Sequence, residues 1–91
     1  MAELKKDMCV KFKSLPEYWE KELDNRKPNT VRVVDWEDKR FQNLKENNYA
    51  RIKIFNTRTN ESFERIIEDI TFFSTHTIEL VIISWEDKNF R

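Results

Sequence analysis

Apolar and polar residues follow a two-residue period in four segments of the chain, which are residues 8–12, 30–34, 49–55 and 62–73, and a fifth segment spans residues 77–85. This alternation is typical of strands that turn one face toward a hydrophobic core. It is clearest where Ala50, Ile52 and Ile54 are separated by basic residues. The last segment is almost continuously apolar, which indicates the most deeply buried strand. The pattern therefore predicts five strands.

The fourth segment does not keep its phase throughout. Apolar residues stand next to each other at Ile66-Ile67 and again at Phe72-Phe73. Because one inserted residue moves every later side chain to the opposite face of a strand, these slips predict a bulge or a bend. Such irregularities are expected where a small sheet curls on itself.

A first helix is predicted after residue 14. Ser14-Leu15-Pro16-Glu17 has the capping-box pattern, in which Ser14 is the N-cap residue and Glu17 reaches back to its amide. The helix should end near Asp24. Its predicted apolar stripe consists of Leu15, Tyr18, Trp19 and Leu23.

A second helix is predicted from Trp36 to about Glu46. Asp35 can cap its first turn. Its apolar stripe contains Phe41 and Leu44 together with the tryptophan. Each of the three tryptophans of the chain lies in an apolar pattern, so we expect all three to pack in the core.

The length allows one domain, because 91 residues bury only a modest core and leave no room for a second. We therefore expect residues 1–91 to form a single domain. Five strands with two short helices predict an α+β fold built on a small, mostly antiparallel barrel. An open α+β sheet with both helices on one face is the alternative.

Composition limits the classes of function. Lysine plus arginine and aspartate plus glutamate each total 17, so the net charge is zero and any binding of a polyanion must be local. The single cysteine, Cys9, lies in an apolar run and indicates a core thiol in a reducing compartment. No apolar stretch approaches the ~18 residues of a membrane span, and residues 1–7 have no hydrophobic signal region. The sequence predicts a cytoplasmic protein without a membrane partner.

Residues for metal or cofactor chemistry are sparse in the sequence. It has no cluster of Cys, His and acidic residues at metal-ligand spacing, no glycine-rich phosphate loop and no nucleophile elbow. The only histidine, His76, stands in a predicted turn, where a solvated side chain is expected. We expect neither a metal nor a cofactor.

A primary amine, a hydroxyl and a guanidinium occur within six residues, at Lys27, Thr30 and Arg32. They follow the first helix and a turn at Asn25, a residue type that tolerates the left-handed conformation, in a chain without glycine. Thr30 and Arg32 share one face of the strand, and Lys27 can fold back over that face. The pattern predicts a small cationic pocket that contains one hydroxyl.

This Lys-x-x-Thr-x-Arg pattern, after a helix and a tight turn, resembles the ASCH domains of the PUA-like superfamily, in which a turn glycine stands where this chain has Asn25. Residues 12–19 are similar to small phage and prophage members of that group. The resemblance implies a small PUA-like mixed β-barrel with two short helices. It also implies a cleft beside the barrel, lined by Lys27, Thr30 and Arg32.

In the bacterial members of this group that hydrolyse N4-acetylcytidine, the matching lysine and threonine are catalytic, and a glutamate follows the central hairpin. The resemblance thus implies an alternative function as an amidohydrolase, with Thr30 as nucleophile, Lys27 as base and Glu68 completing the site. Only residues 74–76 stand where those enzymes have a helical insertion, so Glu68 and Asp69 are the nearest carboxylates. We expect no efficient catalysis, because water can keep Lys27 charged in its polar turn.

The leading hypothesis is a binding module for RNA, a nucleotide or a modified base. Lys27 and Arg32 would contact phosphates or base edges, and their replacement by alanine should weaken binding by about 1–3 kcal/mol with little effect on stability. Further contacts to the RNA backbone are expected from the basic residues of the first and third strands, Lys11, Lys13, Arg51 and Lys53. A phage adaptor that binds a host protein is the remaining alternative.

Overall fold

Backbone pairing joins five strands into one sheet within residues 8–85, the part of the chain that the computed structural model describes. In chain order the elements are β1 (Met8–Ser14), α1 (Pro16–Leu23), β2 (Asn29–Val33), α2 (Lys39–Lys45), β3 (Tyr49–Asn56), β4 (Ser62–Ser74) and β5 (Glu79–Trp85). All five predicted strands and both predicted helices are therefore present.

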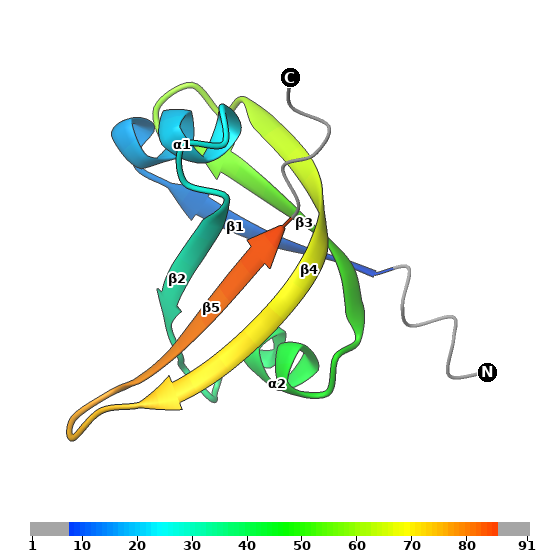
Figure 1. Ribbon diagram of the computed structural model, residues 1–91, viewed down its shortest axis with the longest axis vertical. Coiled ribbons are helices and arrows are strands. Elements are labelled where there is room, and N and C mark those ends of the chain that lie inside the picture. The colour runs from blue at the N-terminus through cyan, green and yellow to red at the C-terminus, as the bar shows by residue number, and fades with distance from the viewer. Residues whose placement is uncertain (1–7, 86–91) are drawn as a thin grey trace.

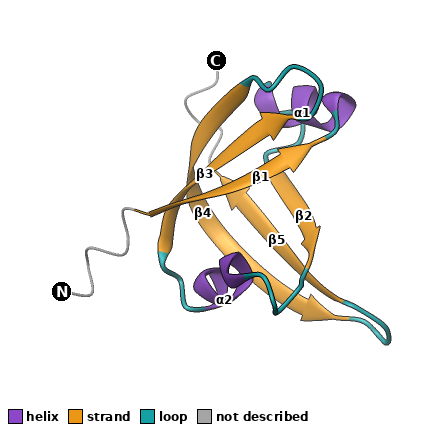
Figure 2. Ribbon diagram, turned by 180° about the vertical axis from the view of Figure 1, so that it is seen from behind, coloured by secondary structure: helices purple, strands orange, loops and turns teal. Residues whose placement is uncertain are grey.

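The sheet has the strand order β1-β3-β4-β5-β2, so β1 and β2 form its two edges. β1 pairs with β3 in parallel, and the other neighbouring strands are antiparallel. The sheet curls into a half-barrel, with α1 at one end and α2 at the other (Figures 1 and 2). This arrangement confirms the predicted α+β class. The helices lie at opposite ends of a curled sheet and not side by side on one face.

The long strand β4 belongs to both halves of the curled sheet. Its first part pairs with β3 and its second part with β5. The register of the β4–β5 ladder shifts between Ile67 and Asp69, which confirms the bulge predicted from the phase slip at Ile66-Ile67, whereas the ladder runs through Phe72 and Phe73 without a shift. Because a bulge increases the local bend and twist of a strand, it lets β4 leave one half of the sheet and join the other (Figure 1).

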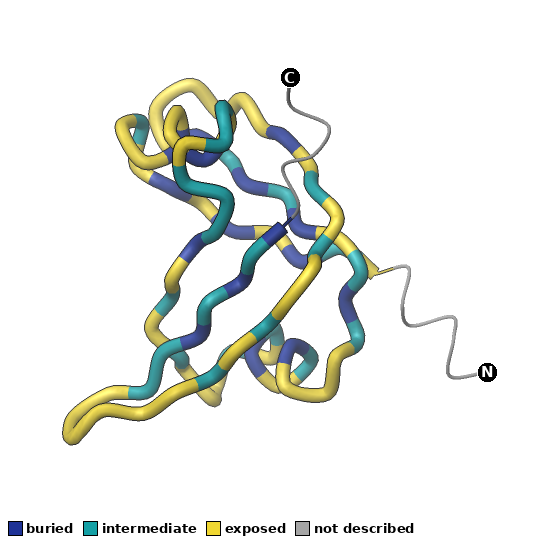
Figure 3. Tube along the Cα trace, in the orientation of Figure 1, coloured by how far each residue is buried: buried dark blue, intermediate teal, exposed yellow. Residues whose placement is uncertain are grey.

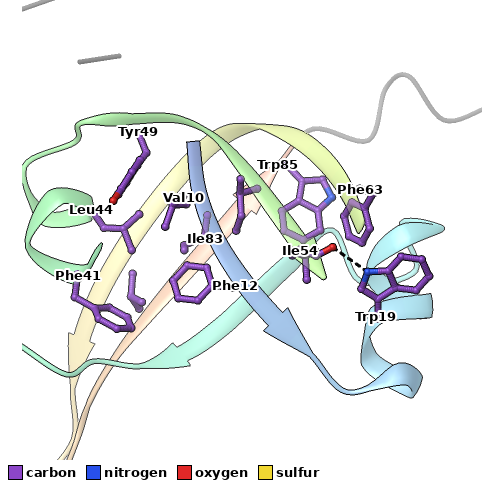
Figure 4. Close-up of a cluster of buried hydrophobic side chains, with 12 residues drawn as sticks. Val10, Phe12, Trp19, Phe41, Leu44, Tyr49, Ile54, Phe63, Ile83 and Trp85 are labelled. Atoms are coloured by element: carbon purple, nitrogen blue, oxygen red, sulfur yellow. Dashed lines mark hydrogen bonds between the residues drawn. The ribbon is translucent and has the colours of Figure 1, made fainter. Parts of the chain in front are cut away.

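The inward-facing side chains of the strands and both helices form one hydrophobic core (Figures 3 and 4). It consists of Val10, Phe12, Trp19, Phe41, Leu44, Tyr49, Ile52, Ile54, Phe63, Val81, Ile83 and Trp85. Trp19 attaches α1 to the sheet, because its Nε1–H donates a hydrogen bond of 2.9 Å to the backbone oxygen of Ile54 (Figure 4). Burial of these apolar side chains is the main favourable contribution to folding.

The capping box predicted at the start of α1 is wrong. Ser14 is the last residue of β1, and the N-cap position belongs to Leu15, whose side chain makes no capping hydrogen bond. Of the predicted apolar stripe only Trp19 is buried, and the other buried residue of the helix is Glu22. A helix of 8 residues at the end of a half-barrel covers the sheet with one narrow face, which here includes a carboxylate.

The second helix, α2, begins at Lys39 and not at Trp36 as predicted. Its N-cap residue is Asp38, whose carboxylate accepts a hydrogen bond of 3.0 Å from the Arg40 amide. Asp35, the predicted cap, accepts a hydrogen bond from a backbone amide within the preceding turn. Either aspartate fits the N-cap pattern, so the spacing of the apolar residues alone did not distinguish them.

The three tryptophans lie in different environments. Trp19 and Trp85 are buried in the core, as predicted, whereas Trp36 is 44% exposed. The Trp36 ring stacks on Phe72 with a centroid distance of 5.9 Å, and its Nε1–H donates a hydrogen bond to the Glu79 carboxylate. The predicted core position is therefore wrong for Trp36, which belongs to the turn before α2 and not to the helix.

Asparagine takes the place of glycine where the backbone needs a positive φ. Asn25, Asn47 and Asn60 have φ values of 63°, 60° and 64°. Asn25 follows the end of α1, and Asn47 follows the end of α2. The left-handed turn predicted at Asn25 is confirmed, and Asn47 has the same conformation after α2, because the short polar side chain of asparagine reduces the cost of this conformation.

Replacement of Asn47 tests this use of asparagine. Asn47→Ala should lower the free energy of unfolding by about 1 kcal/mol, because alanine has the steric cost of the left-handed conformation without the local hydrogen bonding of asparagine. Asn47→Gly should leave stability unchanged or raise it by about 0.5 kcal/mol. Urea denaturation of both variants measures the difference, and equal stabilities would contradict the explanation.

Candidate ligand-binding site

The two edge strands of the half-barrel are connected by Arg32 of β2. Its Nη1 donates a hydrogen bond of 2.6 Å to the backbone oxygen of Lys13, and its Nη2 donates one of 2.8 Å to the hydroxyl of Ser14. Its Nε donates to the Thr30 hydroxyl at 3.0 Å. The guanidinium also lies 4.8 Å from the centroid of the Phe12 ring. We call this contact region between β1 and β2, centred on Arg32, the seam.

A second arginine reaches the same edge of β1. The Nη1 of Arg40, from α2, donates a hydrogen bond to the backbone oxygen of Lys11, and the guanidinium lies 4.4 Å from the Phe12 ring. Arg40 is held in turn by the carboxylate of Asp38, at 2.6 Å. Two backbone carbonyls at the free edge of β1 therefore accept from arginine side chains, where a closed barrel would have a neighbouring strand.

A buried carboxylate lies behind the seam. Glu22 of α1 is 2% exposed, and its Oε1 accepts a hydrogen bond of 2.9 Å from the Ser14 hydroxyl. The ammonium of Lys27 lies 3.7 Å from Oε2 of the same carboxylate and donates to the backbone oxygen of Asn29 at 2.9 Å. A buried charge is tolerated when it is paired and hydrogen-bonded, and Glu22 meets both conditions.

Burial and neighbouring charges both act on Arg32. Partial burial lowers the pKa of its guanidinium, the Glu22 carboxylate opposes this shift, and the positive charge of Arg40 adds to it. An arginine stays protonated in proteins even so. The seam therefore contains a fixed positive charge, connected through the Ser14 hydroxyl to the Glu22 carboxylate.

The structure brings Lys27, Thr30 and Arg32 into one network, as the predicted shared face requires. Thr30 is 2% exposed, and its hydroxyl accepts the hydrogen bond from Arg32. Lys27 is connected to Arg32 through Glu22 and Ser14. The network is thus occupied by contacts within the protein, and the binding or catalytic roles of these residues stay predictions.

Glu68 and Asp69 do not join this network. Glu68 lies at the bulge of β4, and Asp69 pairs with Ser84 of β5. Thr30 pairs with Ile83 on the opposite side of β5, so it is separated from β4 by two strand spacings, or roughly 10 Å. Both carboxylates instead line a groove of about 420 Å³ between α2 and β4. The carboxylate near Lys27 is that of Glu22.

Sequence reasoning missed Glu22 and assigned Ser14 to a different role. A signal for Glu22 was present, because it stands three residues after Trp19 and seven after Leu15, at positions that share one face of a helix. A charged residue in that stripe indicates either an interrupted apolar face or a buried partner. No local pattern could identify the partner, since Lys27 lies beyond the end of the helix.

A basic surface covers the outer face of β1 and β3, next to the seam. Lys11 pairs with Lys53, and Lys13 pairs with Phe55, so these four side chains form two adjacent rows. The Lys53 ammonium lies 5.6 Å from the centroid of the Phe55 ring. Arg51 continues the same face and forms an ion pair with a glutamate of β4. We call Lys11, Lys13, Lys53 and Phe55 the basic face. It combines three positive charges with one partly exposed ring.

Cys9 and His76 are two further residues of types that often take part in catalysis or metal binding. Cys9 is half-buried and lies outside the core, so its predicted core position is wrong. Partial burial raises the pKa of its thiol, and the negative charge of Glu64 adds to the shift, so the thiolate form is disfavoured. His76 is exposed, as predicted. Within residues 8–85, no group of three or more His, Cys, Asp or Glu side chains is placed to hold a metal ion. None of the described helices has the length and apolar character needed to span a bilayer.

The chain was compared with models of protein families, with curated proteins and with solved structures. None of them matches it. The function must therefore be inferred from the arrangement of its own residues.

Proposed function

We propose that this protein is a small binding module for single-stranded RNA, which lies across the basic face. One base would stack on Phe55, and the phosphates on either side would contact Lys11, Lys13 and Lys53. The observation that carries the proposal is the pairing of Lys13 with Phe55 beside the Lys11–Lys53 pair, which places three cations and one aromatic ring together on the outer face of the sheet. Stacking platforms flanked by basic residues are a common way to hold unpaired bases.

The charge distribution supports a local contact and not a long-range one. The net charge of the chain is zero, so RNA would be attracted by this face and not by the molecule as a whole. Three phosphate contacts release few counterions, and the logarithm of the binding constant should fall with the logarithm of salt concentration with a slope of about −2. Binding should therefore be weak at physiological salt and measurable at low salt.

The proposal also gives the seam a function. Arg32 binds the backbone oxygen of Lys13, whose side chain belongs to the basic face, so the seam fixes the end of β1 that carries this lysine. We infer from the order of α1, the Asn25 turn and the Lys27, Thr30 and Arg32 pattern that the half-barrel is a PUA-like barrel of the ASCH type. In this view the seam supports the RNA-binding face by fixing the end of β1.

The environment of the Thr30 hydroxyl favours a binding function over hydrolysis. A nucleophile must reach the acyl carbon, but this hydroxyl is buried and accepts a hydrogen bond from Arg32. Lys27 is engaged by Glu22 and by the Asn29 oxygen, so it is not arranged as a free amine. An RNA-binding role requires none of these groups to move.

Fluorescence anisotropy with a labelled single-stranded RNA of about ten nucleotides tests the proposal at low salt. Phe55→Ala should weaken binding by about 1–3 kcal/mol, because it removes the ring on which a base would stack. Lys13→Glu should weaken it further by placing a negative charge beside the phosphates. Phe73→Ala is the matched control, since Phe73 is an exposed phenylalanine in the part of β4 that pairs with β5.

The control should bind RNA as tightly as the unmodified protein. Equal affinities for Phe55→Ala and Phe73→Ala would place the RNA on another surface. No change in anisotropy at low salt with the unmodified protein would reject the RNA-binding function itself.

A further inference from the structure

A groove of about 420 Å³ lies between α2 and β4, next to the bulge of β4. Four successive residues of β4, from Ile67 to Ile70, line it. In a regular strand neighbouring side chains point to opposite faces, and the bulge accounts for the turning of both Glu68 and Asp69 toward one space. The bulge therefore places two carboxylates in a groove whose volume is typical of small-molecule sites, which occupy about 300–1,000 Å³.

The hydroxyl of Tyr49 has no hydrogen-bond partner in the part of the chain that the structure describes. The side chain is only 8% exposed, lines the groove and points toward α2 beside Leu44 (Figure 4). Every fully enclosed side-chain nitrogen and oxygen within residues 8–85 has a partner, so this unpaired oxygen must open onto the groove. A mostly buried hydroxyl without a partner costs free energy, and a ligand atom can supply the missing hydrogen bond.

Opposite charges line this groove without pairing with each other. The Glu68 carboxylate forms neither a hydrogen bond nor an ion pair with any described residue. Asp69 uses one carboxylate oxygen, Oδ2, to accept a hydrogen bond of 2.7 Å from the Thr71 hydroxyl. The Lys45 ammonium, from α2, lies 4.8 Å from the centroid of the Phe72 ring, and within residues 8–85 no carboxylate lies at ion-pair distance from it. The groove therefore presents two carboxylates from β4, a cation from α2 and an unpaired hydroxyl.

We propose that this groove binds a small zwitterion of the α-amino acid class with an apolar side chain. Glu68 and Asp69 hold the ligand's ammonium, while Lys45 and the Tyr49 hydroxyl hold its carboxylate. The rest of the lining is mostly apolar and consists of Leu44, Asn47, Ile67, Ile70 and Phe72. It surrounds the side chain of the ligand. The groove shares no residue with the basic face, so this inference does not rest on RNA binding.

Titration of the isotope-labelled full chain with L-leucine, followed by amide NMR spectra, tests the proposal. The amide signals of Glu68, Asp69 and α2 should shift with a dissociation constant of about 0.1–10 mM, as expected for a ligand of this size. N-acetyl-L-leucine lacks the ammonium and L-leucinamide lacks the carboxylate, so each should bind at least about tenfold more weakly. The absence of any shift with leucine up to about 50 mM, or equal binding of leucine and either analogue, would overturn the proposal.

Tyr49→Phe removes the unpaired hydroxyl and keeps the ring in the core. It should weaken leucine binding about tenfold or more, because the ligand's carboxylate loses a charge-assisted donor. Since this hydroxyl has no partner within the described chain, the variant should unfold at the same urea concentration as the unmodified chain or at a higher one. Tyr18→Phe is the matched control and should bind leucine normally, because Tyr18 is an exposed tyrosine of α1 outside the groove.

Glu68→Gln tests the negative wall of the groove. It should weaken leucine binding at least about fivefold, because an amide cannot balance the charge of the ligand's ammonium. Glu20→Gln makes the same change at an exposed position of α1 and should leave the affinity unchanged. If either Tyr49→Phe or Glu68→Gln binds leucine as tightly as its control, the groove does not recognise the zwitterion in this way and the proposal is wrong.

Discussion

Glu22→Ala is expected to lower the free energy of unfolding by about 2–4 kcal/mol, a large part of the total stability of a domain of this size. Glu22 is buried, and its carboxylate is the partner of both the Ser14 hydroxyl and the Lys27 ammonium. Its loss leaves a buried hydroxyl without its acceptor and a partly buried cation without its counter-charge, and it also leaves a cavity behind α1. Lys27 is one-third exposed, so water limits its share of the cost.

Urea denaturation of matched variants measures this effect. Glu20→Ala removes an exposed carboxylate from the same helix and should change stability by less than about 0.5 kcal/mol. The loss of stability in Glu22→Gln should lie between those of Glu20→Ala and Glu22→Ala, because an amide can still accept a hydrogen bond from Ser14 but cannot balance the charge of Lys27. Similar losses for Glu20→Ala and Glu22→Ala would show that the buried carboxylate contributes nothing specific.

Arg32→Ala is expected to lower the free energy of unfolding by about 2–4 kcal/mol as well, and to weaken RNA binding in consequence. The pattern of the sequence alone predicted little effect on stability, because it presented Arg32 as a residue that points at a ligand. In the structure the same guanidinium donates to the Lys13 backbone, to Ser14 and to Thr30. Its removal leaves two buried hydroxyls with one partner fewer and separates the edge strands.

The shape of the guanidinium should matter as much as its charge. Arg32→Lys keeps the charge but has no planar fork that can reach three acceptors and lie on the Phe12 ring, so it should recover less than half of the lost stability. Arg58→Ala is the control, since Arg58 is an exposed arginine in the turn between β3 and β4. If Arg32→Ala unfolds at the same urea concentration as this control, the seam does not hold β1 and β2 together.

Glu22→Gln and Arg32→Ala together distinguish indirect support of the basic face from direct contact with RNA. Glu22 is buried and can affect RNA only through the two groups that it contacts, the Ser14 hydroxyl and the Lys27 ammonium. Loss of RNA affinity in Glu22→Gln, measured under conditions where the variant is fully folded, would show that the seam positions Lys13. Loss of RNA affinity in Arg32→Ala but not in Glu22→Gln would instead show that the Arg32 guanidinium contacts RNA directly.

Local sequence determined the elements of this fold. The two-residue period located four of the strands, because one face of each is in the core and the other is in water, and a nearly continuous apolar stretch located the fifth. The phase slip at Ile66-Ile67 located the bulge of β4, since an extra residue must reverse the side-chain pattern. Asparagine marked the turns after both helices, because the chain has no glycine for the left-handed positions. These features depend on neighbours in the sequence.

The shared face of Thr30 and Arg32 was also determined by the sequence, but the partners of that face were not. A strand fixes which side chains point together, and only the curl of the sheet decides what lies opposite them. Here it placed Ser14, at the end of β1, within reach of a guanidinium from β2, although these strands are at opposite edges of the sheet. Local pattern had assigned the same serine to a helix cap, which is the usual role of a serine before Pro-Glu.

Tertiary structure alone decided which carboxylate lies next to Lys27. Sequence order suggested Glu68, on the long strand after the central turn, whereas the half-barrel separates it from Thr30 by the whole width of β5. α1 instead covers the end of the half-barrel and brings Glu22 to Ser14 and Lys27. Periodicity reports whether a position faces inward, but the cost of burying a charge is met only by partners from other elements, and their positions are fixed when the sheet closes around the core.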